Sequence, residues 1–192
     1  MGSQHDFSIP TLGPARIPSP ITLSTRIDDF IANYVSDEQR IIHALEARPG
    51  QEYRYSESDL LELAGPRQQI FFDPSKVHAG IVTCGGLCPG LNDVIRSIVM
   101  CLWYHYGVRR ICGIHMGYRG LLPEFKLSCT ELTPDLVTDI HRTGGTMLGS
   151  SRGHGERTAE LVDSLERMNL NVLFTIGGDG TQRGALAIAE EI

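Results

Sequence analysis

The 192-residue sequence has no long apolar run, and none approaches the roughly 18–20 residues that a membrane-spanning helix needs. The first nine residues are polar, include Asp6, and lack the basic segment and apolar core of a secretory signal. They are also not Arg-rich in the manner of organelle transit peptides. We therefore expect a cytoplasmic protein with no membrane partner.

Positive charge is scarce as well: Lys and Arg total 17 against 23 Asp and Glu, for a net charge of −6. General nucleic-acid binding depends on neutralising phosphates, so we expect no nucleic-acid partner, although a local phosphate site is compatible with this balance. The five cysteines include no C-x-x-C pair of the kind found in zinc and redox sites. We expect them to be unpaired thiols, as is usual in a reducing compartment.

Glycine is scarce only in the first part of the chain, because 17 of the 21 glycines lie between Gly80 and Gly184. The first 20 residues hold four prolines, which favour extended backbone. Between Ile27 and Leu45 the apolar residues recur in part at helical spacing. We predict an N-terminal extension over residues 1–76, partly irregular and partly helical, followed by a second region over residues 77–192.

The second region alternates short apolar runs with amphipathic segments. The predicted strands are 78–84, 110–115 and 171–176, and the predicted helices are 91–103, 133–143, 158–168 and 181–192. Strands that alternate with helices of this length indicate right-handed crossovers and a parallel sheet covered on both faces. The predicted fold class is α/β: a three-layer, Rossmann-like parallel sheet with helices on both faces, incomplete at the C-terminus.

Ligands of such sheets bind beyond the carboxyl ends of the strands, where two glycine-rich turns are expected here. The first turn, Cys84–Asn92, joins a predicted strand to the start of a helix, where free N–H groups and the helix dipole favour an anion. Its glycines match neither the Rossmann fingerprint nor the Walker A loop. A tight connection without any ligand is the alternative interpretation of this turn.

The second turn, Ile176–Thr181, places Asp179 between glycines. A carboxylate beside phosphates repels them unless a cation lies between, and Mg²⁺ is usually held by one or two carboxylates together with phosphates. In the loop 149–153, Arg152 has forked donors that suit phosphate oxygens. The alternatives are a turn or cap role for Asp179 and a solvated surface position for Arg152. Together these residues indicate a domain that binds a magnesium–nucleotide complex and serves phosphoryl chemistry.

Five glycine-containing segments follow one another in the second region: Thr83–Asn92, Gly117–Gly120, Gly144–Thr146, Leu148–Gly153 and Gly177–Gly184. Taken in this order, they resemble the 6-phosphofructokinase family. The resemblance covers about residues 64–192, corresponds to the N-terminal portion of the family, and looks closest to the plant-type ATP-dependent branch. That branch also has an N-terminal extension and a segment like Gly65–Gln68. The G-G-D-G-T sequence alone is shared with NAD kinases and lipid kinases, so the order of the segments carries the resemblance; the first glycine turn argues against an NAD kinase.

The resemblance implies Mg²⁺- and ATP-dependent phosphorylation of fructose 6-phosphate to fructose 1,6-bisphosphate in glycolysis. It also implies an oligomer of identical or related subunits. The residues it assigns to ATP are Gly86, Arg152, Gly153, Gly178, Asp179, Gly180 and Thr181, with Asp179 also on Mg²⁺. Gly180 indicates ATP as the donor, because pyrophosphate-using relatives usually carry Asp at that position.

The family's catalytic base belongs to a T-I-D-N-D segment that is expected beyond Ile192. The resemblance therefore assigns no catalytic residue to this sequence, and we expect the chain by itself to be inactive. Two other interpretations stay open. One is a non-catalytic, nucleotide-binding or regulatory partner of full-length subunits, and the other is a pyrophosphate-dependent phosphofructokinase.

Overall fold

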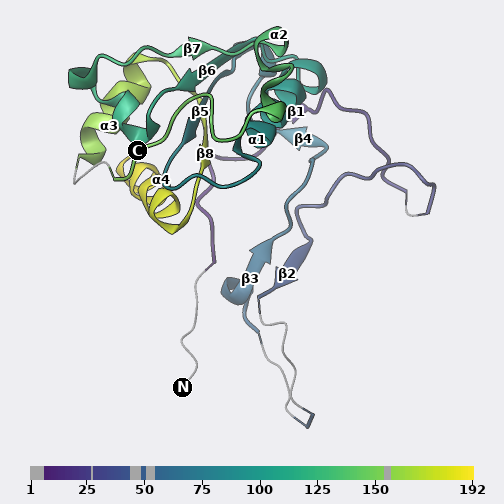
Figure 1. Ribbon diagram of the computed structural model, residues 1–192. Coiled ribbons are helices and arrows are strands. Elements are labelled where there is room, and N and C mark those ends of the chain that lie inside the picture. Colours follow the sequence, from purple (N-terminus) through teal and green to yellow (C-terminus); the bar gives the residue numbers. More distant parts are fainter. Residues whose placement is uncertain (1–6, 27, 44–48, 51–54, 154–156) are drawn as a thin grey trace. The chain divides into compact units, whose positions relative to one another are not determined.

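The computed structural model of the chain describes residues 7–26, 28–43, 49–50, 55–153 and 157–192. The chain divides into two compact units, Met1–Phe72 and Asp73–Ile192 (Figure 1). Each unit is described by itself below. Within the described residues, no helix combines the length and apolar character that a membrane span requires.

Two small antiparallel strand pairs organise the first unit. Strand β1 (Ile17–Pro18) pairs with β4 (Gln69–Ile70), and β2 (Arg40–Ile42) pairs with β3 (Leu60–Glu62), which follows the 3₁₀ turn Glu57–Asp59. The helix predicted between Ile27 and Leu45 is wrong over residues 28–43, and residues 27, 44 and 45 lie outside the described part. Asp28 and Phe30 have positive φ angles, which a helix does not contain, and Phe30 is fully exposed. The apolar spacing therefore does not mark a buried helix face.

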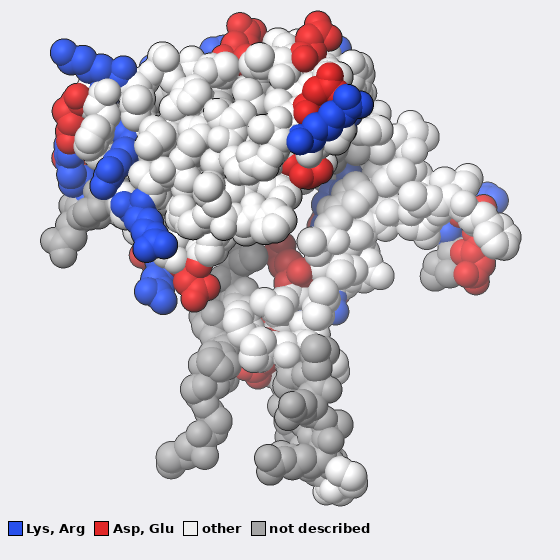
Figure 2. All heavy atoms as spheres, in the orientation of Figure 1, with Lys and Arg blue, Asp and Glu red and all other residues white. Residues whose placement is uncertain are grey.

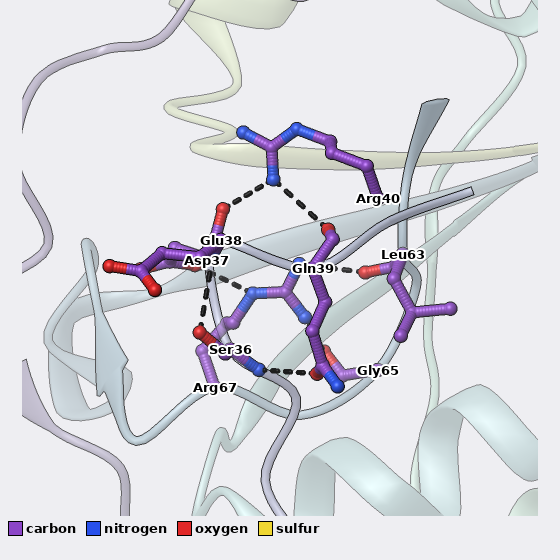
Figure 3. Close-up of polar contacts among 8 residues, drawn as sticks. All are labelled: Ser36, Asp37, Glu38, Gln39, Arg40, Leu63, Gly65 and Arg67. Atoms are coloured by element: carbon purple, nitrogen blue, oxygen red, sulfur yellow. Dashed lines mark hydrogen bonds and ion pairs between the residues drawn. The ribbon is translucent and has the colours of Figure 1, made fainter. Parts of the chain in front are cut away.

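Arg67 connects two loops of this unit (Figure 3). Its Nε donates to the Asp37 carboxylate over 2.7 Å, and its Nη2 donates to the main-chain oxygen of Leu63 over 2.7 Å. Its Nη1 donates to the main-chain oxygen of Gly65 over 3.1 Å. The forked guanidinium thus ties the loop at Asp37 to the segment that follows β3.

A four-stranded sheet, ordered β7-β6-β5-β8, forms the centre of the second unit. Strands β5 (His78–Thr83), β6 (Arg110–Ile114) and β8 (Val172–Ile176) are parallel to one another. The edge strand β7 (Thr130–Glu131) runs antiparallel to β6 and was not predicted. The α/β fold with parallel strands is confirmed, with this one antiparallel addition.

The helices flank this sheet on two sides (Figure 1). They are α1 (Leu91–Met100), which continues as a π-helical turn over Cys101–His105, α2 (Pro134–Val137), α3 (Thr158–Arg167) and α4 (Asp179–Glu191). Short 3₁₀ turns lie at Pro74–Lys76, Gly117–Leu121, Pro123–Phe125 and Ile140–Arg142. Helices α1 and α2 lie on one side of the sheet, and α3 and α4 lie on the other. All four predicted helices are present, although α2 is shorter than expected.

The core lies on both faces of the sheet. On one face, Val82 and Ile114 pack in a cluster with Leu161 and Leu165 of α3. Successive strand residues point to opposite faces, so Ile81 points to the other side, where it is completely buried. Figure 2 shows that charged side chains on the visible face of this unit lie mainly around its margin and form no continuous basic surface.

The expectation that all cysteines are unpaired thiols is wrong at one pair. Cys112 in β6 and Cys129, next to β7, form a disulfide with a Cα–Cα distance of 5.8 Å. The antiparallel pairing of these strands brings the two residues together, since Cys112 lies opposite Glu131. The two cysteines are 17 positions apart, and no sequence motif at this spacing predicts that they pair. Cys84, Cys88 and Cys101 are free.

Candidate functional site

Three loops meet at the carboxyl ends of the parallel strands. The turn after β5 is tied to the loop 149–153, because the main-chain N–H of Gly85 donates to the oxygen of Ser151 over 3.0 Å. The Ser150 hydroxyl returns a hydrogen bond to the oxygen of Gly85 over 2.6 Å. The same turn is tied to the end of β8, since the N–H of Cys84 donates to the oxygen of Ile176 over 2.9 Å. These bonds place segments from positions 84, 151 and 176 around one point.

A cavity of about 450 Å³ lies between these loops. The residues that line it are Cys84, Gly85, Gly86, Tyr118, Ser151, Arg152, Gly153, Gly178, Asp179, Gly180 and Thr181. All seven residues that the family resemblance assigns to ATP are among them. The structure therefore brings together segments that are up to about a hundred positions apart in the chain, and their binding roles stay predictions.

Both signs of charge are present at the cavity. The Arg152 guanidinium faces the first glycine turn, with its Nη2 atom 4.0 Å from the position that a Cβ on Gly86 would occupy. Asp179 is the first residue of α4 and lies among the glycines of the second turn. The sequence predicted a helix start at Thr181, but α4 begins two residues earlier. Asp179 and Gly180 thus belong to the first helical turn, whose N–H groups have no partner within the helix.

Glycine is needed at Gly177 for packing and at Gly85 for conformation. A Cβ on Gly177 would lie 2.2 Å from the Thr181 hydroxyl and 2.6 Å from the main-chain oxygen of Cys84, which no side chain tolerates. Gly85 has a φ angle of +86°, in the left-handed region that favours glycine. By contrast, a Cβ on Gly178 or Gly180 would meet nothing within 4 Å, so these two positions leave open space on the cavity side.

The other titratable groups at the cavity are neutral. Burial raises the pKa of the Cys84 thiol to about 11, with a smaller opposing effect from the Tyr118 main-chain N–H. Burial also raises the pKa of the Tyr118 phenol, and the neighbouring Cys84 raises it further. At neutral pH the thiol is therefore not an activated nucleophile. The chemistry open to the cavity is charge recognition by Arg152, Asp179 and main-chain N–H groups.

The carboxylate set fits Mg²⁺ only in company with phosphates. Among the described residues, no group of three or more His, Cys, Asp or Glu side chains is arranged to hold a metal ion. Among the described residues that line the cavity, Asp179 is the single carboxylate. Mg²⁺ bound by one protein carboxylate needs its remaining ligands from water and from phosphate oxygens. The open space at Gly178 and Gly180 leaves room for such phosphates.

Sequence reasoning missed four of the lining residues: Cys84, Gly85, Tyr118 and Ser151. Gly85 and Ser151 adjoin assigned residues in the same motifs, so proximity in sequence was an available signal. Tyr118 lies within the segment Gly117–Gly120, to which the family resemblance assigns no binding role. Its position beside Thr181, 63 residues away, follows from the order of the strands and not from any local pattern.

Comparison with known proteins gives a family match over most of the second unit. The family described as "Phosphofructokinase" matches residues 78–192. An ATP-dependent 6-phosphofructokinase of Borreliella burgdorferi is 51% identical over 187 residues, covering 97% of this chain and 41% of the relative. One of Trypanosoma cruzi is 47% identical over 193 residues, covering 98% and 39%. The chain thus spans about two fifths of the length of these relatives.

A plant relative and a solved structure agree with this match. ATP-dependent 6-phosphofructokinase 7 of Arabidopsis thaliana is 54% identical over 129 residues, covering 67% of this chain and 26% of the relative. The crystal structure of Pichia pastoris phosphofructokinase in the T-state superimposes with a TM-score of 0.55 at 24% identity, covering 73% of this chain and 14% of that one. At this identity the structural likeness supports the fold alone.

Proposed function

Because the chain belongs to the phosphofructokinase family, we propose that residues 77–192 supply the ATP and Mg²⁺ side of an ATP-dependent 6-phosphofructokinase. In this proposal residues 1–76 are an N-terminal extension of that domain. The proposed reaction moves the terminal phosphoryl group of ATP to fructose 6-phosphate, giving ADP and fructose 1,6-bisphosphate. The observation that carries the proposal is that Gly86, Arg152, Asp179 and their glycine neighbours line one cavity.

Each group has a role in positioning or charge neutralisation, which dominate phosphoryl transfer. Arg152 pairs with phosphate oxygens through its forked donors. The first turn of α4 offers main-chain N–H groups to the phosphate end. Asp179 holds Mg²⁺, which neutralises phosphate charge when bound. Gly178 and Gly180 keep the space beside these groups free of side chains.

The sugar-phosphate side of the reaction needs groups that this cavity does not have. Of the described lining residues, Asp179 is the only carboxylate and is assigned to the metal, while Cys84 and Tyr118 are neutral at pH 7. We propose that the base toward the sugar hydroxyl comes from a segment that does not line the cavity. On that view this chain binds the nucleotide and by itself transfers little phosphate.

The family resemblance further supports a cytoplasmic glycolytic enzyme built from identical or related subunits. Sedimentation velocity of the chain alone and of the chain mixed with full-length subunits measures that association. Sedimentation of the mixture as the sum of its separate components would contradict it.

The direct test is calorimetric titration of the chain with MgATP and with Mg²⁺ alone. We expect saturable binding of MgATP and no saturable binding of Mg²⁺ alone, because one carboxylate cannot hold the ion without phosphates. Replacement Asp179→Asn should weaken MgATP binding about tenfold or more and should change binding of ATP in EDTA much less.

The matched control is Asp163→Asn, since Asp163 is an exposed carboxylate on α3 that does not line the cavity. It should leave both titrations unchanged. Absence of MgATP binding by the unaltered chain would overturn the proposed function. Equal loss of MgATP and magnesium-free ATP binding in Asp179→Asn would overturn the metal role of Asp179 alone.

A further inference from the structure

Tyr118 joins three of the segments that surround the cavity. Its hydroxyl donates to the main-chain oxygen of Thr181 over 2.8 Å, in the first turn of α4. Its main-chain N–H hydrogen-bonds to the side chain of Cys84, at the end of β5. Tyr118 itself lies in the 3₁₀ turn that follows β6. One residue therefore connects the ends of two strands with the start of the helix that carries Asp179.

The junction is buried. Tyr118 is 2% exposed, Thr181 is 5% exposed and Cys84 is 6% exposed. A hydrogen bond in such surroundings has a fixed geometry, because neither partner has water as an alternative. The carbonyl of Thr181 is therefore held by a side chain that belongs to a different loop.

The same helical turn is held from a second direction. A Cβ added to Gly177 would lie 2.2 Å from the Thr181 hydroxyl oxygen, and a Cβ added to Gly85 would lie 3.9 Å from it. The Thr181 side chain therefore fills the space beside both glycines. The Thr181 N–H donates to the oxygen of Gly178 over 2.9 Å, which tightens the first turn. With the side chain packed on the glycines and the carbonyl held by Tyr118, little freedom is left to the turn that contains Asp179.

We propose that Tyr118 is a positioning residue: its hydroxyl fixes the first turn of α4 so that the Asp179 carboxylate faces the Mg²⁺ of MgATP. This inference rests on the proposed function of the cavity. A displacement of about 1 Å in a group that neutralises charge weakens its interaction markedly, so a single hydrogen bond behind the turn affects affinity. Tyr118 acts through Thr181 and Asp179.

The test is the substitution Tyr118→Phe, which removes one oxygen atom and keeps the ring that fills the core. Calorimetric titration should show MgATP binding weakened about fivefold to tenfold, because the buried hydrogen bond to the Thr181 carbonyl is lost. Binding of ATP in EDTA should change less than about twofold. The ratio of the two affinities reports the position of Asp179, and a merely structural role of the hydroxyl would change both affinities together.

Tyr104→Phe is the matched control, because Tyr104 is 68% exposed and lies away from the cavity lining. It should leave the ratio unchanged. If unaltered chain binds MgATP and Tyr118→Phe keeps the same ratio, the positioning role is overturned and the proposed function stands. If unaltered chain does not bind MgATP, both are overturned.

A second measurement does not depend on how the variant folds. Amide hydrogen exchange of the unaltered chain should slow at residues 116–120 and at residues 179–185 together when MgATP is added, because the hydrogen bond links the two segments. Protection that is confined to residues 179–185 would overturn the proposal.

Discussion

At the scale of single residues, Gly180 is the position at which a substitution tests the choice of phosphoryl donor most directly. It is the second residue of α4 and lines the cavity next to Asp179. A Cβ there would meet nothing within 4 Å, and its φ angle is not in the left-handed region. The absence of a side chain is therefore not required by packing or by backbone conformation. Under the proposed function, the phosphates of ATP are the reason for a glycine at this position.

Replacement Gly180→Asp should weaken ATP binding about tenfold or more, since a second carboxylate beside the phosphates adds like-charge repulsion. An acidic residue in the first turn of a helix is itself favourable, so the folded state should not lose stability. Titration calorimetry and a thermal unfolding curve measure the two effects separately. Gly180→Asn, of the same size without the charge, should stay within about threefold of the unaltered affinity. Unchanged ATP affinity in Gly180→Asp would contradict the donor argument.

At the scale of elements, periodic segments with a buried face could be predicted from the sequence. The apolar run of β5 and the amphipathic spacing of α1 lie where expected, because both elements bury the residues that make the pattern. Between Ile27 and Leu45 a similar spacing failed, since Phe30 and Ile31 are exposed and no buried face stabilises a helix over residues 28–43. Helix α2 begins at its predicted Thr133 cap but ends early, where the Thr138 hydroxyl bonds to the oxygen of Pro134.

The parts of the candidate site that could be predicted are those marked by short sequence motifs. The contacts that depend on the order of the strands could not be predicted. The glycine turns, Arg152 and Asp179 stand out within short motifs, and the fold places them around one cavity. The link from Tyr118 to Thr181 and the pairing of Cys112 with Cys129 depend on which strands are neighbours. Strand β7 is only two residues long, too short for a recognisable alternation, so neither its pairing nor the disulfide beside it could be foreseen.

The disulfide between β6 and the start of β7 gives a prediction for this edge of the sheet. Closing a loop of this length stabilises a fold by about 3 kcal/mol, chiefly by restricting the unfolded chain. We expect the reduced protein to lose about 2–3 kcal/mol of unfolding free energy in urea, with Cys129→Ser giving the same loss without reductant. Cys88→Ser, at an exposed free cysteine, should have no such effect. Titration of five free thiols in the unreduced, unfolded chain would contradict the pairing.

At the scale of the whole molecule, the two units differ in how their chains are stabilised. Every fully buried hydrophobic residue among the described positions lies between Val77 and Ile188, so the described part of residues 1–72 contributes none. That unit depends on short strand pairs and on polar links such as those of Arg67. Exposed ion pairs and two- or three-residue strands contribute little stability, because water competes for the same groups. Local opening should therefore cost less free energy in residues 1–72 than in the sheet unit.

Limited proteolysis measures this difference. With a protease of broad specificity, the first cuts should fall within residues 1–72 and leave a resistant fragment that begins near Asp73, because cleavage requires a locally opened chain. Mass spectrometry over a time course identifies the cut sites, and the same digestion in urea serves as the control in which both units are cut alike. MgATP should slow cleavage of the glycine turns around the cavity and leave the early cuts unchanged, since binding stabilises only the unit that holds the site. Early cuts within β5, β6 or β8 would show instead that the sheet unit opens as easily as the extension, and its buried core would then not be what orders the chain.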